Sequence, residues 1–412
     1  MNVSPSFSPP IKLMQPYFLV ASFFYACSMF TLYFLEPSTD ILDLKTVAWS
    51  HLYMLGFVML SIFSAMAQLG PIVVETNHHN IKIFKYLWLT LVFGLVWMLV
   101  GFYISIKFLL FGGSVILVTM LIYALEFLLT LKTARRKTAI TNAMKMSNFF
   151  LMVGIISGLS MALSFNGFLD IDITNIIKVH TFGLLVGFVI LLIMGISIVL
   201  IPMFGLAKRI SDNEFLKSFI TITLAVVVMS LSPFFMTKTL EQISYFFTVL
   251  AIVLYFFQLY KMAKSRKKVV YDIWTNSIYV AFLSFFISFT LFLLYMYNQN
   301  EIVLKLASFL LLVGFFGFVI IANLYKIIPF LMWFHTYSPY VGEKPVPMLH
   351  ELLDQRASNL QLIYSTVGLV ATSFGIIFQD KMTYYGGVSF LVFGAVLFLV
   401  SVYKILCYNK SK

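Results

Sequence analysis

The stretch GFVMLSIFSAMAQLGP (residues 56–71) decides the fold, because the chain contains the same pattern twice more. The second copy is GFVILLIMGISIVLIP (residues 187–202), and the third is GFFGFVIIANLYKIIP (residues 314–329). Each copy begins with Gly-Phe and has a proline fifteen residues after the glycine. The first glycines of successive copies are 131 residues apart (56 to 187) and 127 residues apart (187 to 314). Such a regular repetition predicts a repeated architecture.

The composition is that of a helical membrane protein. The 412 residues are 61% hydrophobic and only 11% charged, and the mean hydropathy is +0.97. Soluble globular domains do not have this balance, whereas polytopic membrane proteins do. Neither Cys27 nor Cys407 has a Cys-x-x-Cys partner, so neither a disulfide framework nor a thiolate metal site is predicted.

Twelve apolar runs are long enough to cross a hydrocarbon core about 30 Å thick. They do not alternate apolar and polar residues, which excludes a transmembrane β-barrel. The sequence therefore predicts an all-α membrane protein with twelve transmembrane helices. The spans are expected at about 17–35, 47–74, 83–103, 106–131, 146–168, 176–204, 215–235, 241–263, 272–297, 302–332, 358–378 and 382–407.

Basic residues are distributed asymmetrically over the loops. With the N-terminus inside, the outer side holds six Lys residues, and the inner side holds the other 22 of the 28 Lys and Arg. This positive-inside pattern predicts a multi-pass protein of the cytoplasmic (inner) membrane with both termini in the cytoplasm. The net charge of +12 then belongs to loops beside anionic lipid, and nucleic acid is not an expected partner. The six outer residues are Lys45, Lys107, Lys178, Lys238, Lys305 and Lys381.

The three Gly-Phe copies lie in spans two, six and ten, so each lies in the second helix of a set of four. We expect a single membrane domain (residues 1–412) of three four-helix repeats around a pseudo-threefold axis, at about residues 1–135, 136–265 and 266–412. The long cytoplasmic loop, residues 333–357, contains three prolines and the segment PMLHELLDQR, which predicts a short helix on the membrane surface. Besides the lipid bilayer, the expected partner is a respiratory or assembly protein that docks on this loop.

Two segments and the threefold plan resemble a known family. HLYMLGFVMLSIFSAMAQLGPIV (residues 51–73) is similar to the histidine-led second span of divergent relatives of the haem–copper oxidase subunit I. NLYKIIPFLMWFHTY (residues 323–337) is similar to the end of their tenth span. The topology of the whole chain also resembles that subunit and the NnrS-type haem and copper membrane proteins. The resemblance implies that His51 is a haem ligand and that His180, on span six, occupies the position of a copper ligand.

The ligand set of a working oxidase is incomplete in this chain. Span ten, EIVLKLASFLLLVGFFGF, lacks the family's two histidines, and span seven, FLKSFITITLAVVVMSLSPFF, lacks its His-His pair. We therefore expect a haem-binding accessory protein for redox sensing, nitric-oxide tolerance or cofactor handling, rather than a complete oxygen-reducing oxidase. No catalytic residue is assigned, a full copper site is not expected, and the sequence leaves open whether the protein is an enzyme. The alternative is a cofactor-free twelve-helix transporter or an assembly partner of a respiratory complex.

A structural interpretation of both histidines stands beside the functional one. Each histidine is expected near the outer boundary of the hydrocarbon, where an imidazole also bonds to a carbonyl group or to water. Their distances to the repeat glycine differ by two residues, about 200° of helix rotation, so the two rings are not expected to face the same way. His180 shares a helix face with Gly183 and Gly187, which predicts a close-packed seam between helices.

Other polar residues have simpler interpretations. Glu126 near the inner end of span four is a candidate for proton loading, but pairing with the basic cluster at residues 132–137 is the simpler expectation. Lys326 is expected to extend to the aqueous interface. Span two has a polar face that is expected to form hydrogen bonds between helices. The residues of this face are Ser50, Ser61, Ser64 and Gln68. Solvated loop positions are expected for the other histidines, which are His78, His79, His335 and His350.

Overall fold

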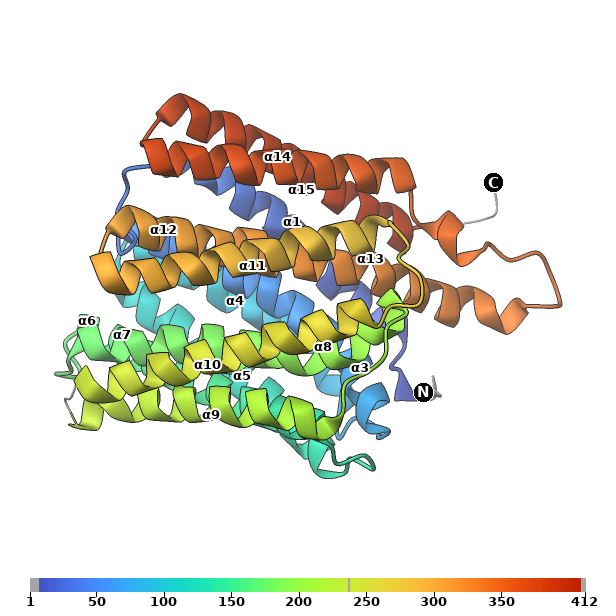
Figure 1. Ribbon diagram of the computed structural model, residues 1–412, viewed down its shortest axis with the longest axis horizontal. Coiled ribbons are helices and arrows are strands. Elements are labelled where there is room, and N and C mark those ends of the chain that lie inside the picture. Colours follow the sequence, from blue (N-terminus) through green and yellow to red (C-terminus); the bar gives the residue numbers. More distant parts are fainter. Residues whose placement is uncertain (1–6, 236–237, 409–412) are drawn as a thin grey trace. The chain divides into compact units, whose positions relative to one another are not determined.

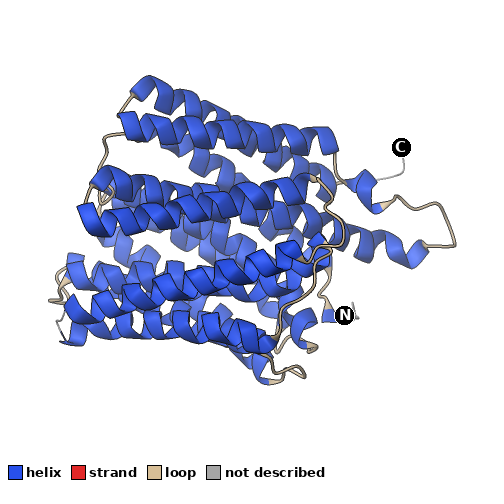
Figure 2. Ribbon diagram, viewed as in Figure 1, coloured by secondary structure: helices blue, strands red, loops and turns tan. Residues whose placement is uncertain are grey.

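The computed structural model describes residues 7–235 and 238–408. Throughout this part of the chain the regular structure is helical (Figure 1 and Figure 2), and twelve helices are long and apolar enough to cross a membrane. The prediction of an all-α chain with twelve spans is confirmed, and the chain is a multi-pass membrane protein. The two chain ends, residues 1–6 and 409–412, for which the charge pattern predicts a cytoplasmic position, lie outside the described residues.

Side-chain caps define where several spans begin. At six helices an Asp or Asn side chain accepts hydrogen bonds from first-turn N–H groups, which have no partner within the helix itself. Each cap lies at the start of the corresponding apolar run or up to four residues before it. The capping residues are Asp43, Asp172, Asp272, Asn300, Asp354 and Asp380.

The chain divides into two compact units, and one division falls inside span two, between Met66 and Ala67. Unit one consists of residues 7–8 and Ala67–Val270, and unit two consists of Pro9–Met66 and residues 271–408. Unit one therefore contains spans three to eight. Unit two contains span one, most of span two, and spans nine to twelve.

Unit one is built from antiparallel helix pairs. Its elements are η4 (Ile81–Ile83), α4 (Phe84–Tyr103), α5 (Ile106–Lys132), α6 (Ala139–Phe165), α7 (Ile173–Phe182), η5 (Gly183–Ile190), α8 (Leu191–Gly205), α9 (Asp212–Phe235) and α10 (Lys238–Lys264), together with the end of α3 (Leu60–Val74). The helix α4 pairs with α5, and α9 pairs with α10. Span six, formed by α7, η5 and α8, packs along α6.

Unit two has the same kind of packing. Its elements are α1 (Ile11–Thr31), η2 (Leu32–Phe34), α2 (Leu44–His51), η3 (Leu52–Met59), the start of α3, α11 (Ile273–Asn298), α12 (Glu301–Phe309), η6 (Leu310–Gly317), α13 (Phe318–Met332), η7 (Trp333–Tyr337), η8 (Ser338–Tyr340), η9 (Leu349–Leu352), α14 (Gln355–Phe378) and α15 (Lys381–Leu406). The helix α14 pairs with α15, and α15 also packs against α1. Between spans ten and eleven, the helical elements are the short turns η7, η8 and η9.

Three spans contain an eight-residue π-helical segment. These segments are η3, η5 and η6, and they begin at residues 52, 183 and 310. They therefore have the same spacing as the repeat glycines. Each segment is followed by a fifteen-residue α-helix that contains the proline of the repeat. The repeated sequence thus forms the same local backbone three times, and π-helical segments within α-helices are frequent at functional sites.

The first glycine of each copy permits a close approach by the preceding span. A Cβ atom at Gly56, Gly187 or Gly314 would lie only 2.7 to 2.8 Å from a side chain of that span. Carbon atoms do not approach so closely without displacement, so these positions require glycine or a shift of the neighbour. In all three copies, the π segment therefore packs directly on the helix before it. The residues contacted are, in the same order, Phe24, Phe150 and Ser284.

Candidate functional site

His51 is the last residue of α2 and directly precedes the π segment η3. Its Nδ1 atom lies 2.8 Å from the carbonyl oxygen of Val47, one helical turn earlier. A carbonyl oxygen only accepts hydrogen bonds, so Nδ1 carries the proton and Nε2 carries the lone pair. Histidines that bind iron or zinc typically donate their second nitrogen in this way. The tautomer of His51 therefore suits an axial haem ligand.

Aromatic side chains surround this part of unit two. The Tyr53 ring stacks on Trp49 with centroids 5.7 Å apart, and it meets the Phe57 ring at 5.5 Å. The Tyr25 ring from α1 lies 4.6 Å from the ring of Phe57. These four side chains are buried. They form an apolar wall on the side of span two that faces α1, and such a wall limits the access of water.

His180 has a different environment. Its Nδ1 atom lies 2.8 Å from the carbonyl oxygen of Gly154 on α6, so this ring also has its proton on Nδ1. The imidazole lies against Gly158, where a Cβ atom would come within 2.7 Å of the ring. A Cβ at Gly183 would lie 3.6 Å from the Gly154 backbone. The predicted close-packed seam at His180 is confirmed, and His180 joins span six to span five.

The two predicted ligands belong to different units, His51 to unit two and His180 to unit one. His51 bonds to a carbonyl group of its own helix, whereas His180 bonds to a carbonyl group of the neighbouring helix α6. The two-residue difference in their positions relative to the repeat glycine is consistent with this, because it turns the two rings in different directions. In the third copy, the positions five and seven residues before Gly314 are occupied by Phe309 and Ala307.

Haem and copper place different demands on these residues. Haem iron is held by one or two axial side chains, which His51 can supply. A copper ion held by protein alone needs several nitrogen or sulfur donors in one place. Within residues 7–235 and 238–408, no three His, Cys, Asp or Glu side chains lie close enough to hold a metal ion. His51 and His180 each contribute a single imidazole donor, which is the number that a haem ligand requires.

On the polar face of span two, two of the serines form hydrogen bonds within their own span. The Ser50 hydroxyl donates to the carbonyl of Thr46, and the Ser64 hydroxyl donates to the carbonyl of Leu60, both within the same span. Serine hydroxyls in helices often return to the preceding turn in this way, because it satisfies them without a neighbour. The carbonyl group of the Gln68 side chain accepts a hydrogen bond from Ser8 in the N-terminal segment.

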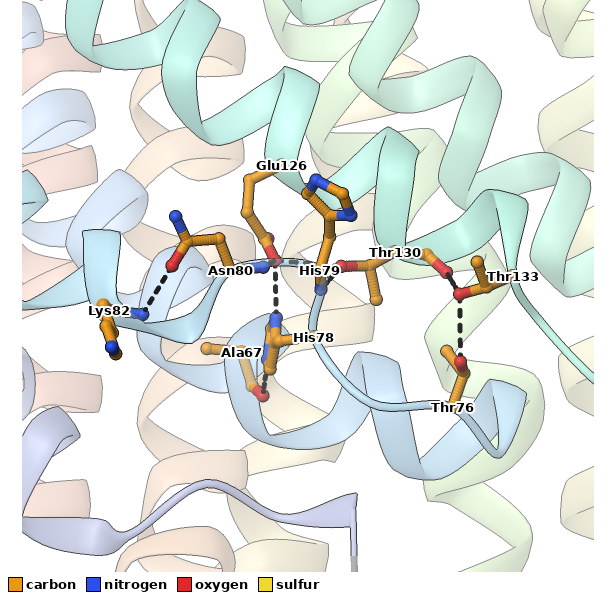
Figure 3. Close-up of polar contacts among 9 residues, drawn as sticks. All are labelled: Ala67, Thr76, His78, His79, Asn80, Lys82, Glu126, Thr130 and Thr133. Atoms are coloured by element: carbon orange, nitrogen blue, oxygen red, sulfur yellow. Dashed lines mark hydrogen bonds and ion pairs between the residues drawn. The ribbon is translucent and has the colours of Figure 1, made fainter.

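A buried histidine–glutamate pair lies in unit one (Figure 3). The Nδ1 atom of His78 lies 3.0 Å from Oε1 of Glu126, and the two side chains are only 4% and 3% exposed. The His78 Nε2 atom donates to the carbonyl oxygen of Ala67 on α3, at 2.7 Å. Oε1 of Glu126 also accepts hydrogen bonds from the Thr130 hydroxyl and the Asn80 N–H. The segment after span two is thereby fastened to both α3 and α5.

Both predictions for this pair are wrong. His78 is not solvated, and Glu126 binds His78 rather than the basic cluster; Arg136 of that cluster pairs with Glu75 instead, at 3.0 Å. The cause is a chain reversal at Glu75, whose φ of 54° is in the left-handed region. The reversal returns residues 76–80 over the end of α5. The one signal in the sequence was an acidic residue within a span, which requires a partner.

A cavity of about 480 Å³ lies in unit two. It is lined by the start of α11, the second half of α13, the element η9 and the start of α14. Lys326 lines it and forms an ion pair with Asp272, with Nζ 2.6 Å from Oδ2 and both side chains about one third exposed. Burial raises the pKa of Asp272, but the bonds from Lys326 and the Thr275 N–H outweigh it and hold that pKa below its ordinary value. His350, from the long loop, also lines this cavity.

No protein-family model matches the chain, and a search of curated proteins finds no significant match. Assignment of a function therefore rests on the residues and contacts described above.

Proposed function

We propose that the chain is a divergent relative of the haem–copper oxidase subunit I that binds haem through His51 and has an accessory role. The observation that carries the proposal is the position and tautomer of His51. This residue directly precedes the first of three corresponding π segments, and its Nδ1 bond to Val47 leaves the lone pair on Nε2. Redox sensing, nitric-oxide tolerance and cofactor handling during oxidase assembly are the roles that such a protein serves.

The proposed architecture is three four-helix repeats arranged around a common axis. Two observations support it. The three π segments have the same separations along the chain as the three repeat glycines, and each π segment packs on the span before it. The proposed location is the cytoplasmic membrane with both termini inside, which is supported by the predominance of Lys and Arg on one side.

In unit two, among the residues that the structure describes, His51 is the histidine that adjoins one of the three repeated eight-residue π segments. Haem held by one histidine keeps one coordination position of iron for a small ligand. The chain's own contribution is to orient the imidazole through the carbonyl group of Val47. His180 is the second candidate ligand, although its present contacts with Gly154 and Gly158 also account for it as a packing residue.

The second candidate function is a cofactor-free transporter or assembly partner. The buried pair of His78 and Glu126 favours it, because ionisable residues inside membrane proteins frequently bind transported protons or ions.

Absorbance spectroscopy separates the two functions. The full-length protein is purified in detergent from haem-replete cells, and bound haem is measured by its Soret band and by a pyridine haemochrome assay. We expect haem in the wild type, loss of it in His51→Ala, and retention in the matched control His335→Ala, which changes a histidine in η7, directly after α13. A haem-free wild type, or equal haem in His51→Ala, contradicts the proposal.

A further inference from the structure

We propose that His78 and Glu126 form a proton-binding site, which exchanges protons with the aqueous side at the loop between spans two and three. The site is independent of haem, because it lies in unit one and shares no residue with the environment of His51. Its geometry is shown in Figure 3.

The hydrogen bonds fix the number of protons. His78 Nε2 must donate, because its partner is the carbonyl oxygen of Ala67. The 3.0 Å contact between His78 Nδ1 and Glu126 Oε1 is a hydrogen bond only if one proton lies between the two atoms. That proton belongs either to an imidazolium beside a carboxylate or to a carboxylic acid beside a neutral imidazole. Both descriptions have the same number of protons and no net charge.

The second carboxylate oxygen is where a further proton binds. Oε2 of Glu126 is buried and has no hydrogen-bond partner, whereas Oε1 accepts bonds from three donors. A buried carboxylate oxygen without a hydrogen-bond partner is costly, so Oε2 is the position of the pair that remains open to a further proton. Uptake of one proton from water forms the O–H bond at Oε2, and release breaks the same bond, so no other reactant is required. The net charge of the site then alternates between zero and plus one.

The nearest neighbours of the pair are an aromatic ring and a glutamate that is already paired, so the charge of the site is set by His78 and Glu126. The Phe84 ring from α4 meets the His78 ring edge-to-face at 5.2 Å, and Glu75 is already paired with Arg136. His79, next to the pair, is exposed and connects the loop to water. The titratable or charged residues on the elements around the pair are Glu75, His79, Lys82, Lys85, Tyr86, Tyr103, Lys107, Tyr123, Lys132, Arg135, Arg136 and Lys137.

Infrared spectroscopy of the full-length protein in phosphatidylcholine vesicles tests this site. Difference spectra between alkaline and acidic buffer are recorded in H₂O and in D₂O. We expect acidification to produce the carbonyl band of a protonated carboxylic acid, with a shift in D₂O. The band should be lost in Glu126→Gln and retained in Glu241→Gln, whose carboxylate pairs with Lys178 elsewhere in unit one. Absence of the band in the wild type, or its persistence in Glu126→Gln, overturns the proposal.

A milder variant covers the case in which Glu126→Gln does not fold. Thr130→Val keeps both members of the pair and removes one hydrogen bond to Oε1. Loss of a donor to the carboxyl group weakens the hydrogen bonding of its C=O bond, so the carbonyl band should move to higher frequency in Thr130→Val. An unchanged band frequency in Thr130→Val also overturns the proposal. Haem content plays no part in either measurement, so this result and that for His51 are separate.

Discussion

The hydroxyl group of Tyr53 donates a hydrogen bond to the main-chain carbonyl oxygen of Leu312, with the two oxygens 2.9 Å apart. Tyr53 lies in η3 and Leu312 in η6, so the bond joins the π segments of spans two and ten inside unit two. The same hydroxyl lies so close to Gly317 that a Cβ there would approach it to 2.9 Å. One side chain therefore connects two copies of the repeat where the backbone departs from α-helical geometry.

Tyr53→Phe is expected to destabilise the protein by about 1 kcal/mol, because it leaves a buried carbonyl without this donor. Thermal unfolding in detergent, followed by circular dichroism, measures the effect. The control is Tyr33→Phe, which removes an exposed hydroxyl bonded to Ser389 and should change the midpoint much less. Equal midpoints for Tyr53→Phe and wild type would show that the bond between the π segments contributes nothing.

Gly56→Ala tests the close packing of the repeat glycine. Its new methyl group would meet the Phe24 side chain at 2.7 Å, and displacement of a packed ring costs about 1–3 kcal/mol. The matched control is Gly386→Ala on α15, where no atom lies within 4 Å of the added methyl group. Because alanine favours helices over glycine by up to about 1 kcal/mol, the control should be neutral or stabilising. Thermal midpoints that fall equally in both variants would argue against a specific contact at Gly56.

Hydropathy made the spans predictable from the sequence. Each of the twelve predicted spans has a corresponding helix, because a run of some twenty apolar residues has no other stable form in a bilayer. The Gly-Phe repeat marked the three spans that later proved to share a backbone. The π-helical geometry itself was not predicted, since an apolar segment in contact with neighbours on all sides has no periodicity that distinguishes a π-turn from an α-turn.

The contacts of the loops were not predictable in the same way. The burial of His78 depends on a single left-handed residue, Glu75, and glutamate gives no signal for that conformation. Lys326 and Asp272 are 54 residues apart, and their pairing follows from the packing of α11 against α13. Short-range patterns thus located the spans, whereas the partners of charged residues depended on tertiary structure.

Asp272→Asn is expected to destabilise the protein at neutral pH and to have little effect in acid. The pKa of Asp272 is held below its ordinary value of 3.8, so its ionised form stabilises the folded state. This contribution is complete above the unfolded pKa and is lost as the pH falls through the lower folded pKa. Asparagine can still accept the capping bond from the Thr275 N–H, so the variant isolates the charge. Thermal midpoints measured from pH 7 downward should converge near or below about pH 4; a constant difference would contradict this.

His78→Ala is expected to destabilise the protein by about 3–5 kcal/mol, because it leaves Glu126 buried without its main partner. The control is Arg136→Gln, which breaks the pair with Glu75 on the same loop. That pair is considerably exposed, at 45% and 32%, and should contribute at most about 1 kcal/mol. Chemical denaturation in mixed micelles compares the two variants. Similar losses would show that the His78 pair is no more important than a surface ion pair.

Gly158→Ala tests whether His180 depends on the space that glycine leaves for it. The added methyl group would lie 2.7 Å from Cε1 of the imidazole, so we expect a loss of about 1–3 kcal/mol. His180→Ala alone should cost about 1 kcal/mol through the bond to the Gly154 carbonyl. The double variant removes both the ring and the clash. Its loss of unfolding free energy should therefore be smaller than the sum of the two single losses by at least about 0.5 kcal/mol, a coupling measured by a thermodynamic cycle.

Gly113→Ala on α5 is the control, because the nearest atom to its added methyl group is 3.6 Å away, and it should combine additively with His180→Ala. Strict additivity of Gly158→Ala with His180→Ala would mean that the ring does not occupy this seam.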